Sequence, residues 1–180
     1  MAALRVFLAV APPHEVRLAL VDQLASYSIP GRLIPPDNWH ITLRFLGEID
    51  EVACERYVAA IDQSDLGRDF LVRIDHLGAF PEPSKATVIW AGITRGQEHL
   101  FQLAEIADER ALDAGIAGEE RPFRPHLTLS RVRPQASATD LVDEAELDVG
   151  WRVSQLVLFR TLPGRGTVRY EPLEMFSLSR

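Results

Sequence analysis

The feature that most constrains the fold is a four-residue motif, His-x-Thr-Leu, that occurs once in each half of the chain. The first copy spans residues 40–43 and the second spans 126–129. Each copy opens a run rich in apolar and β-branched residues, which indicates a strand. In each half, a strand and a helical stretch precede the motif, and another helical stretch and a further strand follow it. This repeated order predicts an α+β protein with two pseudo-symmetric lobes, each with a mainly antiparallel sheet and helices, and a cleft between them.

Apolar periodicity gives the individual elements. Helical spacing predicts helices over 14–28, 50–63 and 97–114, and a short one near 140–144, with Asp50 as the N-cap of the second. Strands are expected over 4–9, 39–46, 70–74, 87–93, 126–131, 151–159 and 175–178. With 180 residues the chain is long enough to bury a core. We therefore expect residues 1–180 to form a single domain made of two intertwined lobes.

The spacing within each motif has a chemical consequence. Because side chains alternate along a strand, residues i and i+2 project from the same face. His40 and Thr42 therefore share one face, as do His126 and Thr128, while the apolar residues between them point into the core. Two facing imidazoles can supply one acid and one base near neutral pH. Hydroxyls can donate to phosphoryl oxygens, where charge builds in the transition state. No metal ion is required for such a site.

Several stretches of the chain carry a resemblance to a known family. They are Trp39–Gly47 and Arg124–Arg131, which contain the motifs, the opening strand Arg5–Ala9, and, less specifically, Val88–Gly92 and Tyr170–Leu178. These stretches resemble the two-histidine (2H) phosphoesterases. Within that superfamily the chain is most similar to the RNA 2′,3′-cyclic phosphodiesterases, also called 2′-5′ RNA ligase-like proteins. The resemblance covers nearly the whole chain.

The resemblance implies a bilobal α+β fold and a reaction. The reaction is hydrolysis of a terminal RNA 2′,3′-cyclic phosphate to a 2′-phosphate without a cofactor, and some members also join tRNA halves through a 2′-5′ linkage. By position, His40 corresponds to the proton donor and His126 to the proton acceptor. Thr42 and Thr128 correspond to the phosphate-binding hydroxyls, and Arg131 to the arginine that helps to hold the phosphate. The spacing alone does not say which histidine is the acid.

The charge pattern favours a local anion site. The formal net charge of -7 argues against broad duplex binding, which needs a basic surface. Between residues 121 and 139, however, no acidic residue occurs, and Arg121, Arg124, Arg131 and Arg133 bracket the second motif. Arg44 joins the face of the first motif if that strand stays regular. A basic cleft in an acidic protein suits recognition of one anionic RNA end.

Other conspicuous residues have a structural interpretation beside the functional one. Trp39, Phe45 and Phe123 flank the motifs and could stack on a base, yet core packing is the commoner role of such aromatics. Cys54 is the single cysteine, so an internal disulfide is excluded, and its helical neighbours indicate a buried position. Thr161 stands where relatives often carry serine, and it keeps the hydroxyl.

Alternative functions remain open at this stage. The same chemistry would serve a 2′-5′ RNA ligase or a phosphodiesterase of small cyclic nucleotides, and a different class of protein would bind RNA ends without turnover. A mononuclear zinc hydrolase fits poorly, because no third ligand shows recognisable spacing to the histidine pair. The remaining histidines are expected at the surface or in structural roles: His14, His76 and His99.

The setting of the protein is also predicted. No apolar run approaches the ~20 residues that span a bilayer, and the segment 1–12 lacks the features of a signal peptide. We expect a cytoplasmic monomer without membrane contact. Its expected partner is RNA with a 2′,3′-cyclic phosphate end, with tRNA fragments as candidate substrates.

Overall fold

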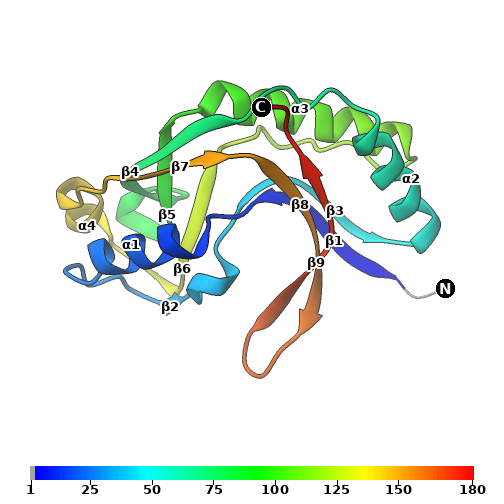
Figure 1. The fold of residues 1–180 in the computed structure, drawn as a ribbon. Coiled ribbons are helices and arrows are strands. Elements are labelled where there is room, and N and C mark those ends of the chain that lie inside the picture. The colour runs from blue at the N-terminus through cyan, green and yellow to red at the C-terminus, as the bar shows by residue number, and fades with distance from the viewer. Residues whose placement is uncertain (1–2) are drawn as a thin grey trace.

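The computed structural model describes residues 3–180, so Met1 and Ala2 of the apolar opening segment lie outside the described residues. Among residues 3–180, nine strands form one curled sheet in which every pairing between named strands is antiparallel (Figure 1). The strands are β1 (Leu4–Val10), β2 (Arg32–Leu33), β3 (Ile41–Ile49), β4 (Phe70–Phe80), β5 (Ala86–Arg95), β6 (His126–Ala136), β7 (Val149–Val153), β8 (Gln155–Pro163) and β9 (Val168–Ser177). Their order is β7-β4-β5-β6-β3-β1-β8-β9, and β2 pairs with β6.

The sheet is joined in its middle by a narrow connection. Between β6 and β3, both of which the structure describes in full, the only residues in register are Ile41 and Leu127, whereas the neighbouring strand pairs share long ladders. This joint divides the sheet into lobe A (β7, β4, β5, β6) and lobe B (β3, β1, β8, β9). The expected α+β fold with two mainly antiparallel lobes is confirmed.

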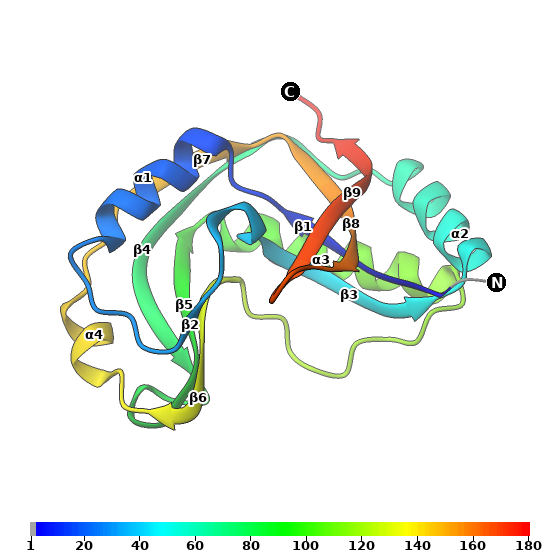
Figure 2. The same cartoon turned by 90° about the horizontal axis from the view of Figure 1, so that it is seen from below.

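The helices connect the lobes crosswise. They are α1 (His14–Leu24), α2 (Glu51–Asp62), α3 (Gln97–Asp113) and α4 (Thr139–Glu144). Helix α1 follows β1 of lobe B but packs beside β7 of lobe A, and α3 follows β5 of lobe A but packs on β3 of lobe B (Figure 2). In the units β1-α1-β3 and β5-α3-β6, the two strands therefore belong to one lobe and the helix packs on the other lobe. None of the helices between residues 3 and 180 is long and apolar enough to cross a membrane.

The helices form where the apolar pattern placed them. On α3 the buried side chains recur at helical spacing: Leu100, Leu103, Ala104, Ala107 and Ala111. Asp50 caps α2, because its Oδ1 accepts a hydrogen bond from the backbone N–H of Ala53 at 2.7 Å. Helix α1 ends at Leu24, four residues before the predicted boundary.

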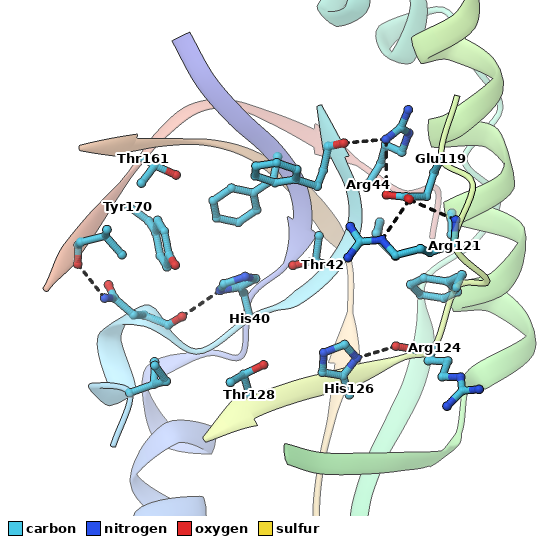
Figure 3. Close-up of a pocket in the computed structure, with 18 of the residues that line it drawn as sticks. His40, Thr42, Arg44, Glu119, Arg121, Arg124, His126, Thr128, Thr161 and Tyr170 are labelled. Carbon is cyan, nitrogen blue, oxygen red and sulfur yellow. Dashed lines mark hydrogen bonds and ion pairs between the residues drawn. The ribbon is translucent and has the colours of Figure 1, made fainter. Parts of the chain in front are cut away.

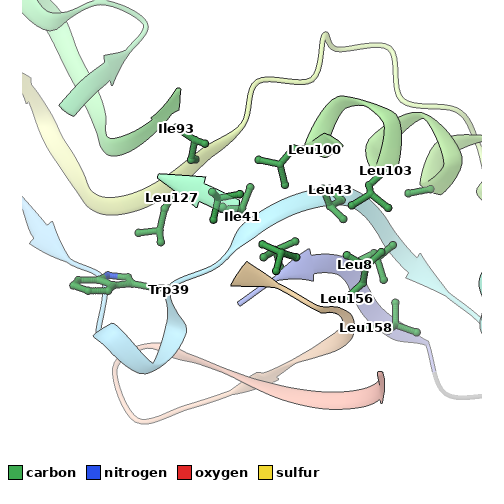
Figure 4. Packing of buried hydrophobic residues seen from close by; sticks show 14 of the residues in the cluster. Leu8, Trp39, Ile41, Leu43, Ile93, Leu100, Leu103, Leu127, Leu156 and Leu158 are labelled. Atoms are coloured by element: carbon green, nitrogen blue, oxygen red, sulfur yellow. The ribbon is translucent and has the colours of Figure 1, made fainter. Parts of the chain in front are cut away.

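The core runs directly beneath both motifs. Ile41 and Leu127 are fully buried at the joint between the lobes, and Leu43 packs near Leu100 and Leu103 of α3 (Figure 4). Burying one such side chain contributes about 1.5–3 kcal/mol. A slip of one residue in either strand would turn these side chains toward solvent. The hydrophobic core therefore holds the histidines of the motifs on the opposite face.

The segment predicted as one strand over 151–159 is two strands in different lobes. β7 ends at Val153 and pairs with β4, whereas β8 begins at Gln155 and pairs with β1. Burial alternates at Val149, Trp151 and Val153, is interrupted by exposed Ser154 and Gln155, and resumes as three consecutive buried residues, 156–158. Because one regular half-buried strand would keep alternating, this interruption marks the break at which the chain passes from lobe A to lobe B.

Candidate active site

A cleft of about 1220 Å³ lies between the two lobes. It is lined by all five site residues predicted from the sequence: His40, Thr42, His126, Thr128 and Arg131. His40 immediately precedes β3 of lobe B and Thr42 lies within it, whereas His126 and Thr128 belong to β6 of lobe A (Figure 3). Arg131 also belongs to β6. Two motifs that lie far apart in the chain therefore meet in one cavity.

The two imidazoles are oriented by the same local contact. His40 Nδ1 lies 2.8 Å from the carbonyl oxygen of Asn38, and His126 Nδ1 lies 2.6 Å from that of Arg124. In both cases the partner is the residue two positions earlier in the chain. A carbonyl oxygen can only accept, so Nδ1 carries the proton in each neutral ring. The Nε2 atom of each ring is thereby left to accept a proton or, when protonated, to donate one.

Each motif ends in a β-bulge, and the first bulge places Arg44 on the sheet face opposite to Thr42, from which its side chain reaches the edge of the cleft. On β3, Thr42 pairs with Ala9 and Arg44 pairs with Leu8, so Leu43 has no partner on β1. Opposed residues project to the same side of a sheet. Arg44 therefore shares the face of fully buried Leu8. The strand is not regular, so the condition under which Arg44 would join the His40 face is not met, although Arg44 still lines the same cleft.

The second bulge has the opposite effect on Arg131. Thr128 and Ser130 pair with consecutive residues of β5, so Leu129 is left without a partner. In a regular strand Arg131 would point away from His126, five positions earlier. The bulge reverses the alternation and places Arg131 on the cleft face. In both lobes the leucine of the motif is thus the bulged residue.

Arg44 belongs to an ion-pair network that anchors the loop before β6. Its Nε lies 2.7 Å from Asp108 Oδ1 and its Nη1 lies 3.8 Å from Glu119 Oε2, and it donates a hydrogen bond to the carbonyl of Ala117. Arg121 Nε in turn lies 3.3 Å from Glu119 Oε1. These carboxylates neutralise two of the arginines expected to make the cleft basic. The contacts of Arg44 and Arg121 with this loop hold it in place.

Other arginines supply the positive charge. Among residues 3–180, four arginines line the cleft without an ion pair to a carboxylate: Arg5, Arg32, Arg124 and Arg131. Sequence reasoning named Arg124 and Arg131 but missed the other two. Arg5 and Arg32 lie far from the second motif in the chain, and only strand pairing brings them to the cleft.

Aromatic rings confine both histidines. The ring centroid of His40 is 4.7 Å from Phe7 and 5.2 Å from Tyr170, and that of His126 is 5.0 Å from Phe80. These three aromatic residues line the cleft and were not predicted as site residues. They belong to β1, β9 and β4, so no local sequence signal connects them to the motifs.

The aromatic residues that were considered from the sequence divide into two groups. Trp39 is buried, and its Nε1 donates to the carbonyl of Ile34, which is the expected core role. Phe45 and Phe123 are half-buried and line the cleft, as does Thr161. Cys54 is buried as expected. His76 lies within β4, which extends beyond the predicted strand end at residue 74.

Burial controls the protonation of the two imidazoles. It lowers the pKa of His40 from 6.5 to about 4, and the positive charges of His126 and Arg131 act in the same direction against the hydrogen bond to Asn38. Burial also lowers the pKa of His126, with a further contribution from Arg131. Burial therefore favours the neutral form of both rings at neutral pH, and the shift is large for His40.

Comparison with known proteins agrees with this arrangement. A sequence model of LigT-like phosphoesterases matches residues 10–90 and 93–170. The chain belongs to this family. The RNA 2′,3′-cyclic phosphodiesterase of Escherichia coli (strain K12) is 30% identical over 181 residues, which cover 98% of this chain and 97% of that protein. The protein of the same name from Thermus thermophilus is 35% identical, with 97% and 90% covered.

The solved structures give the same result for the fold. E. coli LigT complexed with 3′-AMP superposes with a TM-score of 0.86 at 28% identity, and 99% of each chain is covered. The two segments matched by the LigT-like phosphoesterase model contain one motif each, with His40 in the first and His126 in the second. The resemblance to the 2H phosphoesterases is therefore confirmed, and the protein is an enzyme of this superfamily.

Proposed function

We propose that this LigT-like phosphoesterase hydrolyses the 2′,3′-cyclic phosphodiester at the end of an RNA chain and leaves a 2′-phosphomonoester. One observation carries the proposal. Two imidazoles held in the same tautomer enter one cleft from opposite lobes, with a threonine hydroxyl beside each and the unpaired guanidinium of Arg131 near both. The curated relatives at 30% and 35% identity carry the name of this activity.

The reaction requires one base and one acid on opposite sides of phosphorus. His126 Nε2 takes a proton from water as the water oxygen bonds to phosphorus. The bond between phosphorus and the 3′ oxygen breaks, and that oxygen receives a proton from His40 Nε2. The phosphate stays on the 2′ oxygen. Thr42, Thr128 and Arg131 stabilise the negative charge on the non-bridging oxygens. No proton is gained or lost overall, because the histidines exchange their protonation states.

The low pKa of His40 determines what fraction of the enzyme carries the proton that this step needs. The acid must be protonated, yet burial lowers the pKa of the His40 imidazole to about 4. The cyclic phosphodiester carries one negative charge, and an anion within a few ångströms raises the pKa of an imidazole. We therefore assign the acid role to His40 in the substrate complex, where the bound phosphate offsets the desolvation of its ring.

The finer features of the substrate and setting are part of the proposal. The continuous sheet supports residues 1–180 as one folding unit, and we propose that it acts as a cytoplasmic monomer. RNA fragments, including those of tRNA, are the proposed substrates. Hydrolysis of small cyclic nucleotides uses the same steps, and 2′-5′ ligation replaces water by a 5′ hydroxyl. A protein that only binds RNA ends would not need a free Nε2 atom on either histidine, because it transfers no proton.

The test is turnover of a short RNA with a 2′,3′-cyclic phosphate end by wild type, His40→Gln and His126→Gln. Each substitution removes a group that shuttles protons, so kcat is expected to fall about 10²–10⁴-fold. His14→Gln is the matched control, because His14 is exposed at the start of α1, outside the cleft. Tight binding by wild type without any turnover would contradict the proposal and favour the end-binding protein.

A further inference from the structure

Arg32 lies directly beside Arg131 on the sheet. The two-residue strand β2 pairs with β6, and in its register Arg32 is opposite Arg131 while Leu33 is opposite Ser130. Residues directly opposite each other in an antiparallel pair project to the same side. Both arginine side chains are exposed and both line the cleft. Two guanidinium groups thus enter the cleft from neighbouring strands.

The segment that carries Arg32 is fastened to β6 on both sides of it. Ser130 Oγ donates to the carbonyl of Pro30, and the backbone N–H of Ile34 donates to the carbonyl of Leu129 at 2.8 Å. Gly31 has φ of 89°, and a Cβ at this position would lie 2.5 Å from the carbonyl oxygen of Arg131. Only glycine permits both this conformation and this approach. The position of Arg32 is therefore determined by the fold and not by a free loop.

The paired arginines have no compensating charge in the protein. Within residues 3–180, neither guanidinium forms an ion pair or hydrogen bond with another protein group, whereas Arg44 and Arg121 in the same cleft are both bound to carboxylates. Like charges directly opposite in a sheet repel each other. An anion between them removes this repulsion, and guanidinium groups match the geometry of phosphate oxygens.

We infer that Arg32 binds the phosphodiester immediately 5′ of the terminal nucleotide, so that it selects an RNA chain over a free cyclic mononucleotide. The inference rests on the proposed function, in which Arg131 holds the cyclic phosphate. Arg131 lies on β6, three residues after Thr128 of the second motif, whereas Arg32 lies on the neighbouring strand β2, opposite Arg131. Arg32 is therefore one step further from the reacting phosphorus than Arg131. The phosphodiester next to the reacting one in the same RNA chain is the anion that binds Arg32 at this position.

The test compares two substrates that share the reacting group. One is a cyclic mononucleotide, 2′,3′-cyclic AMP, and the other is a dinucleotide with the same cyclic end and one internal phosphodiester. In Arg32→Gln we expect kcat/KM to fall about tenfold more for the dinucleotide than for the mononucleotide, since one charge-assisted contact is lost. The loss should appear in KM rather than kcat. For a longer RNA, the slope of log(kcat/KM) against log salt should decrease by about 0.7.

Two control variants separate this inference from charge effects and from the proposed function. Arg56→Gln removes one exposed, unpaired arginine from α2, outside the cleft, and should leave the ratio of the two substrates at the wild-type value. Arg131→Gln should reduce kcat/KM for both substrates by similar factors. Equal losses for both substrates in Arg32→Gln, or no loss, would overturn the inference. Failure of wild type to cleave either substrate would instead contradict the proposed function.

Discussion

The depressed pKa of His40 predicts a specific loss of stability in acid. The ring has a pKa of about 4 when folded, against 6.5 when exposed. Above pH 6.5 neither the folded nor the unfolded state binds the proton, so the titration of His40 does not make the free energy of unfolding depend on pH. Between pH 6.5 and 4 the unfolded chain binds a proton that the folded protein excludes, and stability therefore falls as pH falls. Below pH 4 both states are protonated and the loss levels off.

The magnitude follows from the two pKa values. Between pH 7.5 and pH 4.5, this single group removes about 2–3 kcal/mol from the free energy of unfolding. His126 contributes in the same direction, since its pKa is also lowered by burial. Carboxylates titrate over this range too, but they cancel when wild type is compared with a variant that differs only at position 40.

Urea unfolding of wild type and His40→Gln at several pH values between 4.5 and 7.5 measures the effect. The substitution changes stability at every pH, so the readout is the change in stability over the pH range, which should be smaller in the variant by about 2–3 kcal/mol. His14→Gln, which removes an exposed imidazole outside the cleft, is the matched control. Parallel curves for wild type and His40→Gln would refute the conclusion that burial keeps this imidazole neutral.

Three further predictions concern the cleft. Arg44→Met removes a buried guanidinium from two partly exposed carboxylates and should lower the free energy of unfolding by about 1–3 kcal/mol, whereas Arg121→Gln at the exposed end of the network should cost less than about 1 kcal/mol; urea unfolding compares them. Thr42→Val and Thr128→Val should each lower kcat about 10²-fold while the serine variants retain most activity, as steady-state kinetics would record. Because burial lowers the pKa of both catalytic imidazoles, the optimum of kcat/KM should lie below pH 6.5 and the optimum of kcat should lie higher, since bound phosphate raises both values. Coincident optima would contradict that last prediction.

The grouping of each histidine with a threonine on one strand face was predictable because the two residues of each motif lie close together in the sequence. Each motif places a histidine and a threonine on one strand face by alternation alone, and the buried Ile41 and Leu127 hold that face toward the cleft. Amphipathic patterns likewise predicted α3 to within one residue, and the Asp50 cap predicted the start of α2. Local rules were sufficient for these features.

What sequence reasoning missed depends on strand pairing. The bulge at Leu43 reverses the face of Arg44, and a bulge is decided by the register with β1, which no local pattern states. Arg32 reaches the cleft only because Gly31 allows its segment to lie against β6. Tyr170 enters from a strand more than a hundred residues away from His40 in the chain. Periodicity and motif spacing carry no information about such long-range contacts.

The central claim is that the two facing imidazoles cleave a cyclic phosphate without a metal ion and leave the phosphate on the 2′ oxygen. The most direct measurement is phosphorus NMR of the product formed from a short RNA with a 2′,3′-cyclic phosphate end, with EDTA present throughout, by wild type, His40→Ala and His126→Ala. The account predicts complete conversion to the 2′-phosphate by wild type, unaffected by EDTA, and no detectable conversion by either variant. A 3′-phosphate product, or activity abolished by EDTA, would contradict it.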